Sequence, residues 1–225
     1  MEVWRQRVKN QIKKSKKKID SREKLLETAV SLFVERGFKG TSIRGIADAL
    51  GVSISNIYHY FGSKEGLWVE ILRYSVEGLP DKLRGICALD MDPLEKFKLL
   101  LRTHLEFADR HRREAKIYFM NEDVLSDHGM EINRRLQADI RDIYLSQLTE
   151  LDKLGLLHCR HLKIDAYNIF AVLMWQLRWR HEKMDIGSDQ VHDILIDFII
   201  RGLINQENAG KKSIKSKTGK RKKTT

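Results

Sequence analysis

Small hydroxyl and amide side chains, two aromatic residues and a lysine stand close together between residues 41 and 64. Side chains of this size and hydrogen-bonding capacity suit the phosphates and base edges of a DNA major groove. The sequence has no Gly-rich phosphate loop, nucleophile elbow or zinc-protease motif, so we expect binding chemistry and not an enzyme. The candidate DNA-contacting residues are Thr41, Ser42, Ser53, Ser55, Asn56, Tyr58, His59 and Lys64.

Four short helices are predicted to position these side chains. Apolar residues recur at helical spacing behind Ser or Thr caps, and glycines follow the helices. Gly51 supplies a sharp turn between the second and third helices, and Val52 and Ile57 are spaced to anchor the third helix inward. A small helical hairpin in a generic bundle would fit the same periodicity. The predicted helices cover about residues 21–37, 41–50, 53–60 and 63–79.

The stretch AVSLFVERGFKGTSIRGIADALGVSISNIYHYFGSKEGL resembles the N-terminal DNA-binding domain of the TetR family of transcriptional regulators. The resemblance covers Leu25 to Leu67 and implies a helix-turn-helix in which the eight residues named above face DNA. It also implies that Tyr60 either contacts a phosphate or packs inside the domain. Two residues depart from the family pattern: Gly62 stands where proline is frequent, and Ile54 stands where a polar or basic residue is common.

The remainder of the chain also reads as helices, so we expect an all-α protein. Hydrophobic residues make up 42% of the 225 residues, which is enough for a packed core. Longer helices are predicted at about 93–112, 129–154, 165–184 and 188–203, with a shorter one around residues 118–120. The predicted organisation is a basic arm (1–20), a DNA-binding domain (21–66), a helical effector-binding and dimerisation domain (67–204) and a basic tail (205–225).

The last two predicted helices carry apolar faces that are broader than one neighbouring helix needs. The TetR resemblance implies that these helices form a four-helix bundle across a two-fold axis. Such a homodimer would present two recognition helices to DNA half-sites about one helical turn, or a little more, apart. An ordinary intramolecular core would use the same faces and remains the alternative.

Residues 174–203 resemble, more loosely, the end of TetR-family regulators of fatty-acid and steroid degradation, which respond to acyl-CoA thioesters. The resemblance implies a small-molecule effector of that class, which needs cations for its phosphates and apolar walls for its chain. Arg178 beside Trp175 and Trp179 could supply a cation and a stacking face, and Phe119 and Met120 could line the same pocket. In the alternative, both tryptophans pack in the core and Arg178 is solvated.

Charge is concentrated at the two ends of the chain. Residues 1–20 and 205–225 each hold eight Lys or Arg, whereas the part between them is slightly acidic within a net charge of +11. These ends would attract DNA phosphates without sequence preference, or would serve only solubility. We expect a cytoplasmic protein because no secretory signal or membrane span is visible and the two cysteines suggest no disulfide framework. We expect no cofactor and no metal, since His158, Cys159 and His161 lack a fourth ligand.

The working hypothesis is a homodimeric, sequence-specific DNA-binding repressor that a small-molecule effector releases from a palindromic operator. Repression and activation are not distinguished by the sequence. The first alternative is an architectural DNA-binding protein that binds without sequence preference through its basic ends. The second alternative, an enzyme on a helical scaffold, finds no catalytic constellation in the sequence.

Overall fold

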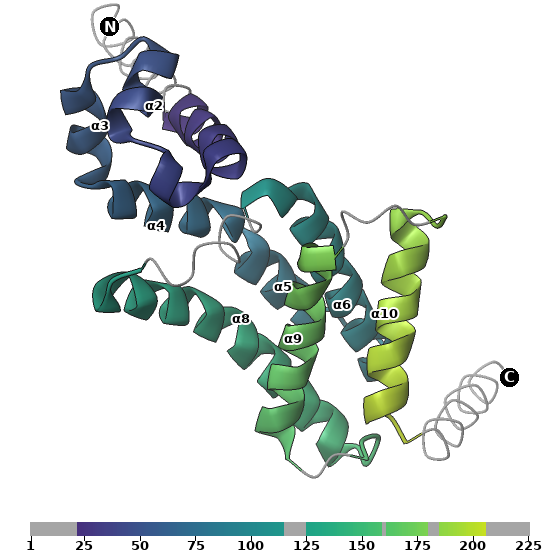
Figure 1. Cartoon of the computed structure of the whole chain (residues 1–225). Coiled ribbons are helices and arrows are strands. Elements are labelled where there is room, and N and C mark those ends of the chain that lie inside the picture. The colour runs from purple at the N-terminus through teal and green to yellow at the C-terminus, as the bar shows by residue number, and fades with distance from the viewer. Residues whose placement is uncertain (1–21, 115–124, 159–160, 180–184, 206–225) are drawn as a thin grey trace, which may run out of the picture. The chain divides into compact units, whose positions relative to one another are not determined.

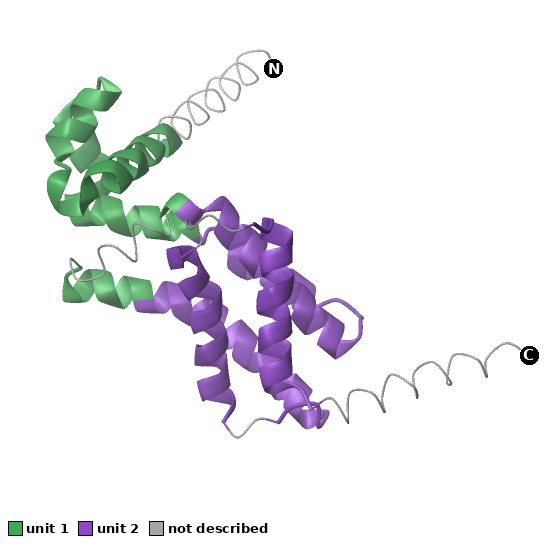
Figure 2. Cartoon of the chain, turned by 45° about the vertical axis from the view of Figure 1, so that its right-hand side comes forward, with its two compact units in different colours: residues 1–75, 113–133 green, residues 76–112, 134–225 purple. Residues whose placement is uncertain are grey.

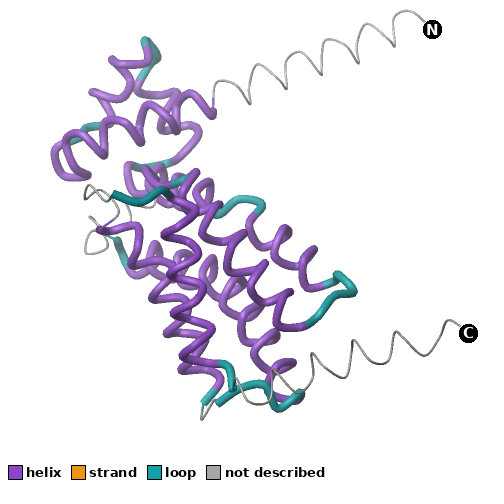
Figure 3. Tube along the Cα trace, turned by 90° about the vertical axis from the view of Figure 1, so that its right-hand side faces the viewer, coloured by secondary structure: helices purple, strands orange, loops and turns teal. Residues whose placement is uncertain are grey.

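The computed structural model describes residues 22–114, 125–158, 161–179 and 185–205. Figure 1 and Figure 3 show that these residues are helices joined by short connections. Within the described ranges there is no strand, and one isolated antiparallel bridge joins Leu157 and Ile204. The prediction of an all-α fold is therefore confirmed.

The chain divides into two compact units, drawn in different colours in Figure 2. The first comprises residues 1–75 and 113–133, and the second comprises residues 76–112 and 134–225. The boundary expected after residue 66 falls inside a helix, whereas the first unit continues to Ser75. The basic segments predicted at both ends lie, apart from Asn205, outside the described residues.

The first unit contains the helical residues 22–40, α2 (Ile43–Leu50), α3 (Ile54–Phe61), α4 (Lys64–Ser75) and the start of α8 (Asp127–Lys153). One apolar face of each short helix is turned inward, which gives the unit its own core. The side chains at its centre, all at most 2% exposed, include Leu26, Ala29, Phe33, Ile46, Ile57, Leu67, Trp68 and Ile71.

Glycines with left-handed backbone separate the helices of the first unit. Gly51 follows α2 with φ 64°, and Gly62 follows α3 with φ 70°. Proline cannot adopt a positive φ, so this junction differs from one built on proline at position 62. The predicted end of the first helix at Gly37 is three residues early. Gly37 does have φ 73°, but the helical residues continue to residue 40.

The second unit contains α5 (Leu79–Cys87), α6 (Pro93–Arg110), most of α8, α9 (Leu162–Trp179) and α10 (Ser188–Leu203). Helix α5 is a correction to the sequence prediction, which continued the fourth helix to Leu79. Helix α4 instead ends at Ser75, and Pro80 stands in the first turn of α5. Proline is tolerated there because the first backbone N–H groups of a helix have no intrahelical partner.

One hydrophobic cluster holds the second unit together, with contributions from all five of its helices. Phe97, Leu101, Tyr144 and Leu173 are completely buried at its centre. The predicted helix around residues 118–120 lies outside the described residues. Among the described helices, none combines the length and apolar character that a membrane crossing requires.

Candidate nucleic-acid interface and effector-binding region

Helix α3 presents a polar face around a single apolar anchor. Ile57 is completely buried, as the sequence predicted, and it fixes the side of the helix that faces the core. Ser55, Asn56, Tyr58 and His59 are all exposed, and 49% of Tyr58 is accessible. A short exposed face that carries hydroxyl, amide and imidazole groups is the kind of surface that reads base edges in a major groove.

The first turns of α2 and α3 are organised by serine caps. Ser42 Oγ accepts a hydrogen bond from the Gly45 N–H at 3.0 Å, and Ser53 Oγ accepts one from the Asn56 N–H at 3.2 Å. Both serines are exposed. A serine hydroxyl that accepts a cap bond still has its own proton to donate, so both groups can also bind a phosphate oxygen.

Thr41 is the one predicted contact residue whose side chain the structure buries, with 3% exposed. Its hydroxyl lies 2.9 Å from the Gly37 carbonyl oxygen and 3.1 Å from that of Leu32. Its backbone N–H donates to the Phe38 carbonyl at 3.3 Å. These bonds tie the start of α2 to the preceding helix, so the structure does not bring the Thr41 hydroxyl to the exposed face with the other candidates.

Lys64 begins α4 and lies over an aromatic ring of the same unit. Its ammonium nitrogen is 4.2 Å from the Phe38 ring centroid, and burial lowers its pKa. The ring holds the ammonium group near the start of α4, where a cation can contact a phosphate. Tyr60 is half-buried, with its ring 6.1 Å from that of Phe61 and 5.7 Å from that of His59.

Two further residues of this region were missed by sequence reasoning. Arg44 is exposed in the first turn of α2, two residues beyond the Ser42 cap, where a cation can reach a phosphate. The sequence signal for Arg44 was a cation in the first helical turn after an N-cap serine. Gly66 is the other, because a Cβ there would collide with the Phe61 carbonyl oxygen. Only glycine lets α4 start so close to the end of α3.

Comparison with known proteins finds two family models that together span most of the chain. Residues 25–71 match the model of tetR-family bacterial regulatory proteins. Residues 90–203 match the model of the tetracyclin repressor-like C-terminal domain. The chain belongs to the TetR family of transcriptional regulators. The resemblance seen in the sequence is thereby confirmed, and the polar face of α3 lies on the DNA-binding domain of this family.

Individual relatives agree with this assignment. The HTH-type transcriptional repressor KstR2 of Rhodococcus jostii is 31% identical over 189 residues, which cover 83% of this chain and 93% of that repressor. The structure of the ketosteroid transcriptional regulator KstR2 of Mycobacterium tuberculosis shares the fold, with a TM-score of 0.69 at 24% identity over 82% of this chain and 95% of that one. AibR, solved with isovaleryl coenzyme A and operator DNA, also shares it (TM-score 0.68, 21% identity, 79% and 97% covered).

The residues predicted to bind an effector occupy the C-terminal part of α9 in this TetR-family chain. Trp175 is 57% exposed, and the Arg178 guanidinium carbon lies 5.2 Å from the centroid of its ring. Trp179 is half-buried. The alternative in which both tryptophans pack in the core therefore fails for Trp175. Phe119 and Met120 lie outside the described residues.

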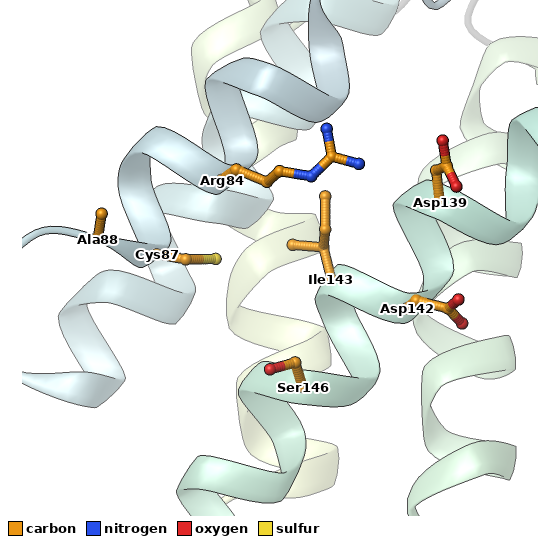
Figure 4. Close-up of a pocket in the computed structure, with 7 residues that line it drawn as sticks. All are labelled: Arg84, Cys87, Ala88, Asp139, Asp142, Ile143 and Ser146. Carbon is orange, nitrogen blue, oxygen red and sulfur yellow. The ribbon is translucent and has the colours of Figure 1, made fainter.

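Two open pockets are found among the described helices of the second unit. The first, of about 570 Å³, lies between α5 and α8, and Figure 4 shows the Arg84 guanidinium opposite the Asp139 carboxylate across it. Cys87 and Ser146 also contribute to its walls, and burial raises the pKa of the Cys87 thiol. The second pocket, of about 700 Å³, is a largely apolar groove between α9 and α10. Trp175, Arg178 and Trp179 are not among the lining residues of either.

The interior of the second unit contains few polar groups. His104 lies 3.1 Å from the Tyr144 hydroxyl, and complete burial lowers the pKa of His104 to about 4. The same burial raises the pKa of Tyr144, so both side chains are neutral near pH 7. Gln176 of α9 is fully buried, and within the part of the chain that the structure describes neither polar atom of its amide has a hydrogen-bond partner. The same interior also buries Lys96 and the His192 ring, whose Nε2 lies 3.0 Å from Asp109 Oδ2.

Proposed function

We propose that the chain is a homodimeric repressor that occupies a palindromic operator and leaves it when a small-molecule effector binds the helical domain. The observation that carries the proposal is the exposed polar face of α3 on a domain that matches the TetR DNA-binding model. The relative from Rhodococcus jostii is a transcriptional repressor, which supports repression over activation. Acting on chromosomal DNA, such a bacterial regulator would work in the cytoplasm.

The α9–α10 surface supports the proposed dimer. Ile164, Ile194 and Phe198 are 56%, 53% and 65% exposed, and Phe198 also lines the apolar groove between the two helices. Apolar side chains exposed to this extent are stabilised when a second copy covers them. A two-fold axis through this surface would bury the same residues on both subunits and pair two copies of α3.

For the effector we propose an acyl-CoA thioester, with Trp175, Arg178 and Trp179 as contacts and with Phe119 and Met120 as lining residues of the same pocket. Arg178 stacked on Trp175 offers a cation and an aromatic face to a nucleotide group. AibR, which shares the fold, was solved with isovaleryl coenzyme A, which makes this class the first to test. Trp175 lies four residues beyond Ala171 of the α9–α10 groove, so Trp175→Ala must be assayed for subunit association as well as for effector response.

The test begins with selection of binding sites from a random double-stranded DNA library. The selected DNA is then titrated with protein alone and with a panel of acyl-CoA thioesters. A palindrome that a thioester releases supports both parts of the proposal. If a palindrome is selected but no thioester weakens its binding, the repressor proposal stands and acyl-CoA thioesters are excluded as the effector. If no sequence is enriched and binding disappears with salt, the basic ends bind DNA without preference and the proposal fails.

A further inference from the structure

Glu65, in the first turn of α4, makes a hydrogen-bonded contact with the start of a helix that lies 61 residues further along the chain. Its Oε1 accepts from the Ser126 backbone N–H at 2.8 Å and from the Ser126 hydroxyl at 2.6 Å. Ser126 directly precedes α8, and its own Oγ accepts from the Gly129 N–H at 3.3 Å. The carboxylate thus adds negative charge to the N-terminus of α8, where the helix dipole stabilises it.

A side chain at position 129 would have to displace the Glu65 carboxylate from its contact with the start of α8. A Cβ on Gly129 would lie 2.5 Å from Glu65 Oε1 and 2.8 Å from Leu125 Cδ2. Gly129 is buried within the first unit. The contact therefore depends on Ser126, directly before α8, and on Gly129, in the first turn of α8, as well as on Glu65, and it can be disturbed from either side.

Glu65 lies in α4, beside the candidate DNA contacts, whereas Ser126 directly precedes α8, a helix that continues into the second unit. Glu65 directly follows Lys64, a candidate phosphate contact, on the helix that succeeds α3. Helix α8 has 27 residues, of which 127–133 belong to the first unit and the rest to the second.

We propose that Glu65 is a positioning residue that couples operator binding to the first turn of α8. The inference rests on the proposed function, because it requires that the chain binds an operator. Loss of the contact leaves the first turns of α4 and α8 without their mutual anchor. DNA binding must then order them again, which costs affinity.

The decisive variants are Glu65→Ala, Gly129→Ala and the double variant, titrated in the full chain against the selected operator. Each single variant is expected to raise the Kd roughly three- to thirty-fold, the effect of losing a helix-cap bond. In the Glu65→Ala background, Gly129→Ala should have a smaller effect than in the wild type, because the carboxylate that the new Cβ would displace is gone and only its contact with Leu125 Cδ2 remains. Glu65→Gln removes one negative charge at the N-terminus of α8 and should weaken DNA binding. Asp48→Asn, the control, removes one negative charge elsewhere in the first unit and should not weaken DNA binding.

Amide hydrogen exchange supplies a readout that a merely structural role would not move. Operator DNA should slow exchange at residues 127–133 in the wild type, and this slowing should vanish in Glu65→Ala while α3 stays protected. Operator binding that leaves residues 127–133 unchanged, or single variants that bind like the wild type, would overturn the inference. Both outcomes leave the operator selection intact, whereas failure of the selection itself would count against the proposed function.

Discussion

The Tyr144 hydroxyl lies 3.1 Å from His104 Nδ1 in an interior where both side chains are completely buried. Burial lowers the pKa of His104 to about 4, from an ordinary value near 6.5. The unfolded chain therefore takes up a proton at this residue at a pH where the folded chain does not. The stability that neutral His104 contributes is fully present above pH 6.5 and is lost as the pH falls towards 4.

When the pH is lowered from 7.5 to 5, the unfolding free energy of the wild type should fall by about 2 kcal/mol because of His104. In His104→Leu this part of the decrease should be absent. Urea denaturation at one protein concentration and both pH values measures it, since dimerisation would make stability concentration-dependent. The exposed His158 provides the control variant, His158→Gln, which should behave like the wild type. Equal pH dependence in His104→Leu and the wild type would contradict the prediction.

Tyr58→Ala and His59→Ala should each weaken binding to the selected operator by about 1–3 kcal/mol, because their exposed side chains are proposed to reach base edges. The loss should be concentrated at one base pair for each variant, which a set of single-substitution operators would show. Tyr58→Phe is the matched control for the hydroxyl alone. Full affinity in both alanine variants would remove these two residues from the base-reading set.

Arg44→Ala should weaken operator and random DNA by a similar factor, since the exposed guanidinium is placed for a phosphate and not for a base. The slope of log affinity against log salt should become shallower by about one. Arg36→Ala, which removes an exposed arginine from the preceding helical residues, tests whether position matters or only charge. An unchanged slope in Arg44→Ala would show that this arginine does not neutralise a phosphate.

Thr41→Val should reduce stability by about 1–3 kcal/mol, because the Leu32 and Gly37 carbonyl groups lose their shared donor. Thr41→Ser keeps the hydroxyl and should recover most of that loss. In conditions where both variants are folded, the selected operator sequence should be the same as for the wild type. A folded Thr41→Val protein that loses affinity for all DNA would instead support the phosphate contact expected from the family pattern.

Phe198→Glu should produce monomers, because it places a charge where 65% of an aromatic side chain is exposed on the proposed dimer surface. Sedimentation equilibrium measures the association state directly. Helical content by circular dichroism should be retained, since Phe198 is not part of the buried core of the second unit. A dimer of unchanged strength would move the proposed two-fold interface away from α10.

The recognition region could be predicted well from the sequence because its signals are local. The Ser53 cap, the buried Ile57 and the Gly51 turn lie within a few residues of one another, and each acts through its neighbours. Thr41 was harder, because the carbonyl groups that engage its hydroxyl belong to the preceding helix, whose path depends on packing. Helix α5 was missed because Pro80 favours the end of one helix and the start of another equally.

Contacts between residues far apart in the chain could not be predicted from the sequence. Glu65 and Ser126 are 61 residues apart, and no spacing rule pairs them. His104 and Tyr144 are 40 residues apart, and the sequence alone did not single out Tyr144. Trp175 and Arg178, three residues apart on one helix, could be paired from spacing, but the exposure of the pair depends on which face of α9 the core takes.

The division of labour within α3 has a practical consequence for retargeting this protein to new DNA sequences. Ser53 holds the first turn of the helix and Ile57 holds its inner side, so a combinatorial library should leave both unchanged. The positions free to vary are the exposed ones at 54, 55, 56, 58 and 59. Ile54, already 39% exposed and without a polar group, is the position at which a newly introduced side chain has the least to displace.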